Sequence, residues 1–275
     1  MASTVSDSGA GAARWRAAQA GLTTMLMRDL RSVRRLINPG RLQATVPTWI
    51  EAVLAIVTRY SDVSATLAAD FYDGERDAAG VVGPFMVPFM VPLADPPPDE
   101  QTSNSLRWAT KDLWPRREGE ATAAQLEPLD VRFEAAMAKA DGAVDRLVLN
   151  TGRSTVTQAV RRDQGAVAYA RAAALGACSF CKLMAARGAT YKDLDSVGRV
   201  ANSGFIGEDS VIKFHNFCRC QPIPVFRGQR FELSPHAAEW GRLYREHAQG
   251  HPGDQLRLFR RALAEHDENP LPGSF

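Results

Sequence analysis

The four cysteines place the strongest constraint on how this chain can fold. All of them lie within 43 residues of a sequence of 275, and they form two motifs, C-x-x-C at Cys178 and Cys181 and C-x-C at Cys218 and Cys220. His215 stands three residues before Cys218, whereas the other four histidines all follow residue 235. If both motifs bind one ion, the fold must bring together two segments that are separated by 36 residues.

Zinc is the metal that this set of side chains favours. A structural zinc site takes four thiolate or imidazole ligands in a tetrahedron. The C-x-x-C motif supplies two of them, and either H-x-x-C or C-x-C supplies the other two. We therefore expect a structural zinc ion bound by four of the five residues Cys178, Cys181, His215, Cys218 and Cys220. The alternative is that some of these cysteines are small buried thiols, since free cysteine is among the most buried residue types.

A redox function is a second interpretation of the C-x-x-C motif. Redox dithiols of this kind stand at the start of a helix that follows a strand. Here the preceding residues, AVAYARAAALGA at 166–177, are expected to continue a helix that starts near Ser154 and runs to Leu175. The predicted context therefore disfavours a redox centre.

A hydrolase is a third interpretation, with His215 as the base. It would pair His215 with a cysteine, or with Ser179 and an acid such as Asp193 or Asp195. The sequence contains no nucleophile-elbow signature or other local motif for such chemistry. His215 is thus either a metal ligand or the one plausible base in the chain.

The first part of the chain has the periodicity of an antiparallel helical hairpin. Residues 1–11 are small and polar and are expected to form a mobile tail. Apolar residues then recur at steps of three and four from Leu22 to Ile37, and a stop signal follows at Asn38-Pro39-Gly40. A second helix is expected to begin near Pro47 and to carry an apolar stripe as far as Phe71.

The first helix also has a basic face. It could contact the phosphates of DNA or an acidic partner, or it could simply be a solvated surface, and the absence of interleaved aromatic residues favours the solvated surface. The arginines that would bind DNA are Arg14, Arg28, Arg31, Arg34 and Arg35.

A proline-rich strip follows, in which the unit PFMV occurs twice within residues 81–92. Prolines at every fourth position exclude a helix interior and a central strand. We expect an extended apolar segment, which either covers the protein's own core or docks on another subunit. A linker at 94–101 leads to a further helix that ends at Trp114.

These patterns predict an α+β fold in three regions. The first is a mostly helical N-terminal region over residues 1–118. The second is a smaller α+β domain over residues 119–230 that contains the Cys/His-stapled loops, because glycines become frequent from Gly176 onward. The third is a helical tail over residues 231–275, with two charged helices near 234–249 and 252–267.

Composition narrows the classes of protein. Hydrophobic residues make up 45% of the chain, which supports a real core, and a net charge of +2 is far from that of a dedicated nucleic-acid binder. No segment has the roughly 18 consecutive apolar residues of a membrane span. The N-terminus lacks the charged stretch followed by an apolar stretch that is typical of a signal peptide. We expect a soluble protein without membrane contact, made in a cytoplasm.

Residues 150–226 resemble the MuF-like minor capsid, or head-morphogenesis, proteins of tailed bacteriophages, in the version found in phages of actinobacteria. The resemblance is carried by YARAAALGACSFCKLMAARGATY and by KFHNFCRCQPIPVF. The matching positions are Arg153, Gly176, Cys178, Cys181, Arg187, Gly188, Tyr191, Phe214, His215, Cys218, Cys220, Pro224 and Val225.

The resemblance implies a protein that acts in procapsid assembly. It implies partnership with the portal protein and the major capsid protein, and a location inside the phage head, after assembly in the host cytoplasm. Similar proteins are often described as capsid maturation proteases, so a protease that cleaves scaffold or shell protein is the alternative. The residues favour a non-enzymatic role, and the resemblance identifies no catalytic residue.

Overall fold

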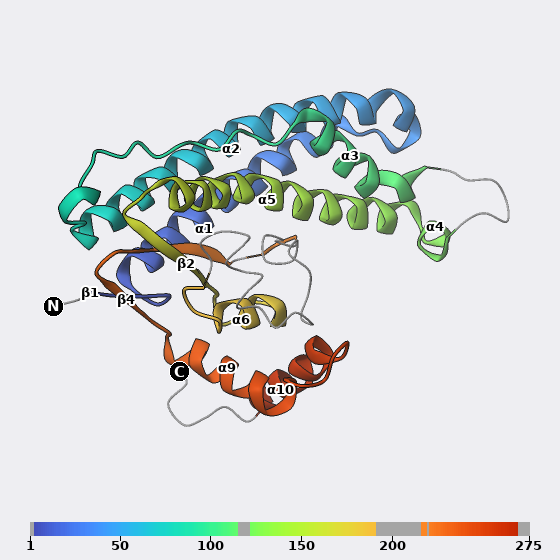
Figure 1. Cartoon of the computed structure of the whole chain (residues 1–275). Coiled ribbons are helices and arrows are strands. Elements are labelled where there is room, and N and C mark those ends of the chain that lie inside the picture. Colours follow the sequence, from blue (N-terminus) through green and yellow to red (C-terminus); the bar gives the residue numbers. More distant parts are fainter. Residues whose placement is uncertain (1–2, 115–121, 191–215, 219, 269–275) are drawn as a thin grey trace.

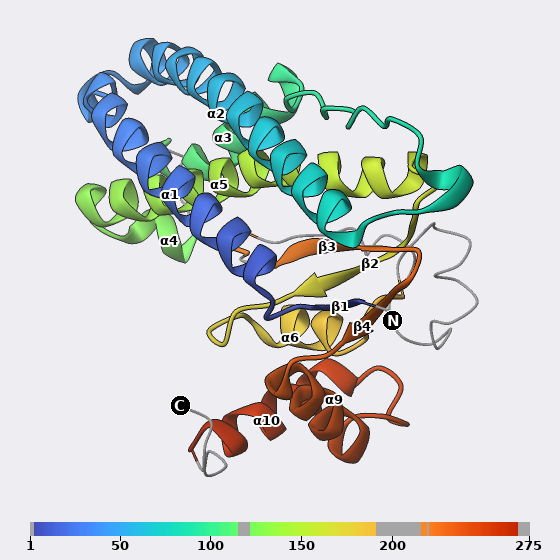
Figure 2. The same cartoon turned by 90° about the vertical axis from the view of Figure 1, so that its left-hand side faces the viewer.

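The computed structural model describes residues 3–114, 122–190, 216–218 and 220–268. Long helices form an upper layer, short strands and one small helix lie beneath it, and two further helices close the lower side (Figures 1 and 2). The predicted α+β fold is confirmed. The division into regions 1–118, 119–230 and 231–275 remains a prediction.

The upper layer is built on the predicted helical hairpin. Its helices are α1 (Ala10–Val33) and α2 (Leu42–Ala79), joined by the 3₁₀ turns η1 (Arg34–Leu36) and η2 (Pro39–Arg41). Leu26 on α1 and Val53 on α2 are fully buried in the shared core. The second helix begins five residues before Pro47, because Leu42 and Val46 extend its buried face backwards.

Helix α5 (Leu129–Arg162) packs against α2 and completes this layer (Figure 1). Gly152 permits the close approach, since a Cβ atom there would lie only 2.7 Å from the carbonyl oxygen of Ser64 on α2. The remaining helical segments of the layer are α3 (Asp99–Thr110), η4 (Lys111–Leu113) and α4 (Ala123–Leu126).

Two small sheets lie beneath the helices. One pairs β2 (Ala166–Ala172) with β3 (Gln221–Phe226) in antiparallel fashion, and the other pairs β1 (Ser3–Ser6) with β4 (Gln229–Glu232) in parallel. The predicted helix from Ser154 to Leu175 is therefore wrong beyond Arg162. Ala170 and Ala172 are completely buried against the layers around the sheet, and pairing with β3 overrides the helix propensity of alanine.

The prediction of a mobile tail at residues 1–11 is also wrong for the described residues 3–11, because this segment contacts residues 229–234 near the other end of the chain. Val5 is buried in strand β1. The Asp7 carboxylate accepts hydrogen bonds from the backbone N–H of Ser234 at 2.6 Å and from its hydroxyl at 2.8 Å. Ser234 is the N-cap of α9 (Pro235–His247), so the N-terminal segment helps to position the C-terminal helices.

The proline-rich strip is extended, as predicted, apart from one 3₁₀ turn, η3 (Gly83–Phe85). Arg76 anchors it by donating to the carbonyl oxygens of Phe85 at 3.2 Å and Val87 at 3.0 Å. Phe85 and Phe89 pack on the core, so the strip covers part of the protein's own interior. Val81 and Val91 are buried as well, whereas Val82, Met86, Val87 and Met90 are exposed.

The lower side consists of α6 (Ser179–Ala185), α9 and α10 (Gln255–Glu268), which share a core of their own. The two predicted C-terminal helices are thereby confirmed. None of the described helices combines the length and the apolar character that a membrane crossing requires.

Candidate metal centre

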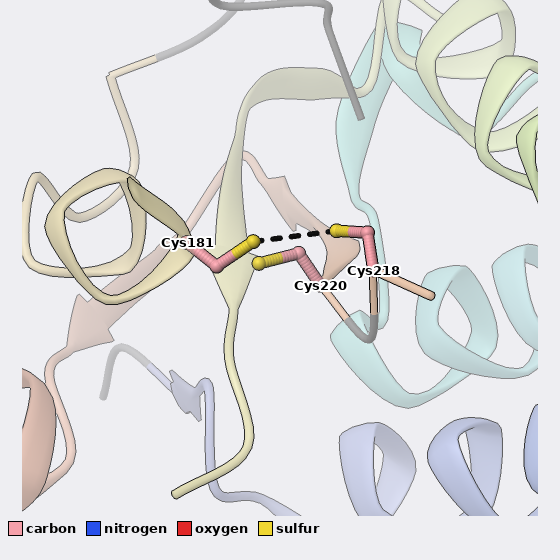
Figure 3. Close-up of side chains that lie close together, drawn as sticks. All are labelled: Cys181, Cys218 and Cys220. Carbon is pink, nitrogen blue, oxygen red and sulfur yellow. Dashed lines mark hydrogen bonds between the residues drawn. The ribbon is translucent and has the colours of Figure 1, made fainter. Parts of the chain in front are cut away.

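Three of the predicted ligands converge on one point beneath α5. The sulfur atoms of Cys181, Cys218 and Cys220 all lie within 4.8 Å of one another, and those of Cys181 and Cys218 are 3.3 Å apart (Figure 3). Zinc–sulfur bonds of about 2.3 Å in a tetrahedron place neighbouring sulfurs about 3.8 Å apart. The three side chains are therefore spaced so that they could hold a metal ion.

Short elements on either side of the sheet position these sulfurs. Cys181 lies in the first turn of α6, and Cys178 is the N-cap residue of that helix. Cys218 and Cys220 come directly before β3, whose pairing with β2 fixes the end of the C-x-C segment. The fold thus joins the two motifs as the sequence predicted.

The other predicted ligands have different positions. Cys178 is exposed and lies outside the close group of three, although its sulfur accepts a hydrogen bond from the backbone N–H of Cys181 at 3.4 Å. His215 lies outside the described residues, as do Asp193 and Asp195. Which four of the five predicted ligands bind remains a prediction.

Arg153 on α5 holds the C-x-C segment from above. Its guanidinium donates to the carbonyl oxygen of Cys220 at 2.9 Å, to that of Cys218, and to the side chain of Asn150 at 2.8 Å. Arg153 is buried. Only the family resemblance had identified this residue. A side chain that donates to two distant backbone carbonyls leaves no motif in the sequence.

The segment also packs directly on the surface of α5. Phe217 has a positive φ of 57° and places its ring over Gly142, where a Cβ atom would lie 2.6 Å from the ring. Gly142 and Arg153 thus mark two contacts of the C-x-C segment with one helix. The sulfur cluster is in this way joined to the upper layer as well as to the sheet.

Hydrogen bonds and burial give the thiols different proton affinities. Hydrogen bonds to Cys178 and Cys218 raise the pKa of Cys181. The hydrogen bond from Cys181, together with the charge of Arg153, lowers the pKa of Cys218. Burial raises the pKa of Cys220. Of these three buried thiols, Cys218 is therefore the one that loses its proton most readily before a metal binds.

A second buried arginine contributes positive charge to the cluster. Arg171 on β2 is 1% exposed and stands opposite Pro222, two residues after Cys220. Its charge acts to lower the pKa of Cys220. Burial lowers the pKa of Arg153, and the thiolate charges of Cys218 and Cys220 oppose that shift. The site can thus accommodate a cluster of negative thiolates.

The same burial restricts what the cysteines can do chemically. Cys181, Cys218 and Cys220 are each at most 2% exposed, so a polypeptide substrate cannot reach their sulfurs in this conformation. The hydroxyl of Ser179 accepts a hydrogen bond from Arg260 of α10 at 3.1 Å. In the part of the chain that the structure describes, the cluster has the character of a structural site.

Acidic side chains accompany part of the predicted basic face of α1. Arg34 forms an ion pair with Asp141 on α5 at 2.5 Å, and Arg28 pairs with Asp29 at 3.4 Å. Arg31 and Arg35 are exposed. The surface that would meet DNA is therefore smaller than the count of arginines suggests.

Comparison with known proteins places the chain in a family. No curated protein and no solved structure matches it significantly. The family model for the VG15 protein matches residues 7–247, which include α1, the strands β2, β3 and β4, and the cysteine cluster. Because this match covers most of the chain, the protein belongs to the VG15 protein family, a family of viral or phage proteins.

Proposed function

We propose that this phage protein is a minor capsid protein of the MuF-like type, which acts in procapsid assembly in association with the portal protein. In this role a structural zinc ion staples the lower layer to α5. The protein resides inside the head of the virion after assembly in the host cytoplasm. The observation that carries the structural role is the burial of Cys181, Cys218 and Cys220 in one cluster.

The donor set supports zinc as the ion. Three cysteine sulfurs lie within 4.8 Å of one another, and zinc binds thiolates as a closed structural site when a fourth ligand is present. Either Cys178 or His215 can supply that ligand. When bound, the ion offsets the entropy cost of closing the long loop between the two motifs.

The exposed side of the proline-rich strip supports contact with another capsid subunit, for which we propose the portal protein. Met86 is 68% exposed and Met90 is 88% exposed, while Arg76 and the two phenylalanines hold the strip in place. Flexible methionine side chains adapt well to an apolar partner surface. Contact with the major capsid protein belongs to the same proposal. So does contact with packaged DNA through the basic face of α1, which consists of Arg14, Arg28, Arg31, Arg34 and Arg35.

Complementation of a phage that lacks this gene tests the assembly role. The wild-type gene should restore procapsids, and the protein should be present in purified heads. His215→Ala should restore heads with normally processed shell protein. Loss of shell-protein cleavage in that variant, with zinc content unchanged, would instead identify a capsid maturation protease with His215 as its base. Normal heads in the absence of the gene would refute the assembly role.

Co-purification with the portal protein tests the strip. The double substitution of Met86→Asp and Met90→Asp should abolish binding, because it places two charges in an apolar interface. Met25→Asp is the matched control, since Met25 is a similarly exposed methionine on α1, 46% exposed. Equal loss of binding in the control, or no loss in the double variant, would remove the strip from the portal interface.

A further inference from the structure

Cys178 lies beside Cys181, one of the three clustered cysteines. It caps α6, and Cys181 follows in the first turn of the same helix. Its sulfur accepts a hydrogen bond from the backbone N–H of Cys181 at 3.4 Å. Cys178 is itself exposed, so it lies next to one member of the buried group of three that Figure 3 shows.

The exposure of Cys178 is compatible with a ligand role. An exposed side chain can change rotamer towards the cluster without displacing packed neighbours. A metal site also needs a path by which the ion enters, and the other three sulfurs are buried. The rim position of Cys178 provides such a path, and its side chain would close the path once the ion is bound.

Charge around the cluster favours a site made entirely of thiolates. A zinc ion with four thiolates has a net charge of about −2, against about −1 when imidazole replaces one of them. Two buried guanidiniums lie near the C-x-C segment. Arg153 donates to the carbonyl oxygens of Cys218 and Cys220, and Arg171 stands opposite Pro222, two residues after Cys220.

We propose that Cys178 completes the metal site, so that four thiolates from Cys178, Cys181, Cys218 and Cys220 bind the ion and His215 is not required as a ligand. This inference rests on the structural metal site proposed above. Arg153 and Arg171 then serve as positioning residues that balance the negative charge of the thiolates.

Cobalt substitution of the full chain tests the ligand set directly. The thiolate-to-cobalt charge-transfer absorption grows with the number of bound thiolates, so it counts them. Cys178→Ser is well suited to this test because serine keeps the capping hydrogen bond of α6 and removes the thiolate. His215→Ala is the matched comparison. Thermal unfolding of each metal-free variant shows whether the fold is retained.

The two variants should behave differently. Cys178→Ser should lose about a quarter of the charge-transfer intensity, and its zinc affinity should fall by at least about 100-fold, the upper end of what loss of an outer-shell partner costs. His215→Ala should keep the full intensity and the wild-type affinity.

Two other results would overturn the inference in distinguishable ways. If His215→Ala loses affinity while Cys178→Ser matches the wild type, the site contains three thiolates and one imidazole, and only the ligand assignment fails. If the wild-type chain binds neither cobalt nor zinc, the structural metal site fails together with the assignment.

Discussion

Replacing Arg153 by methionine removes the hydrogen bonds through which α5 holds the C-x-C segment. The carbonyl oxygens of Cys218 and Cys220 both lose a charged donor in a buried setting. A hydrogen bond to a charged group contributes about 1.5–3 kcal/mol, so two of them give a loss of about 3–6 kcal/mol. Methionine fills much of the vacated space, which keeps any cavity contribution small.

Chemical denaturation of the metal-free protein, followed by circular dichroism, measures this loss. A domain of this kind has a total stability of about 5–15 kcal/mol, so the midpoint should move by a large fraction of its value. Arg161→Met is the control, because Arg161 is exposed near the end of the same helix and should change stability by less than about 1 kcal/mol. If Arg153→Met unfolds within about 0.5 kcal/mol of the wild type, the clamp is not a stabilising contact.

Three further substitutions test the packing that supports the site. Gly152→Ala should destabilise the fold by about 1–3 kcal/mol, because the new Cβ meets the backbone of α2. Gly74→Ala should stabilise the fold by up to about 1 kcal/mol, because its new Cβ meets nothing within 4 Å. Thermal unfolding measures both changes, and the packing argument is contradicted if both variants change stability in the same direction. Asp7→Ala should cost about 3 kcal/mol and increase hydrogen exchange in α9, because Ser234 loses two hydrogen bonds to a carboxylate; unchanged exchange would refute the link. Burial raises the pKa of Glu75, so the folded state binds a proton there more readily than the unfolded state does, and the stability of the fold should fall as pH rises through that raised pKa. Glu75→Gln should flatten this part of the curve of stability against pH. An unchanged slope in that variant would contradict the assignment of the pH effect to Glu75.

Local apolar periodicity was sufficient to predict the upper layer. Residues such as Leu22, Leu26 and Leu30 recur at helical spacing, and the structure buries them all on one face of α1. The stop at Asn38-Pro39-Gly40 separates the two helices because these residues form turns whatever surrounds them. Such features depend on neighbours in the sequence, and so they can be inferred without knowledge of the tertiary fold.

The strands could not be predicted in the same way, because their residues are defined by distant partners. AVAYARA is rich in alanine and has no alternation of polar and apolar residues, yet Ala172 pairs with Gln221 across the site. Ser3–Ser6 pairs with Gln229–Glu232 at the other end of the chain. Arg153 belongs to the same class, since its contacts with Cys218 and Cys220 arise only after the sheet has formed.

The strand β2 also changes the argument about the C-x-x-C motif. A redox centre was disfavoured because the preceding residues were expected to be helical, and that reason is wrong: β2 precedes the motif and Cys178 begins α6. What now weighs against a simple dithiol is the presence of additional sulfurs. Cys218 lies 3.3 Å from Cys181, and Cys220 is in the same buried group. In a redox pair, Cys178 and Cys181 would react only with each other and an incoming substrate, whereas here Cys181 has two more thiols beside it. Three thiols come together in one buried group, and Arg153 binds the backbone carbonyls of two of them. A single ion that these thiols bind explains this arrangement better than a dithiol does.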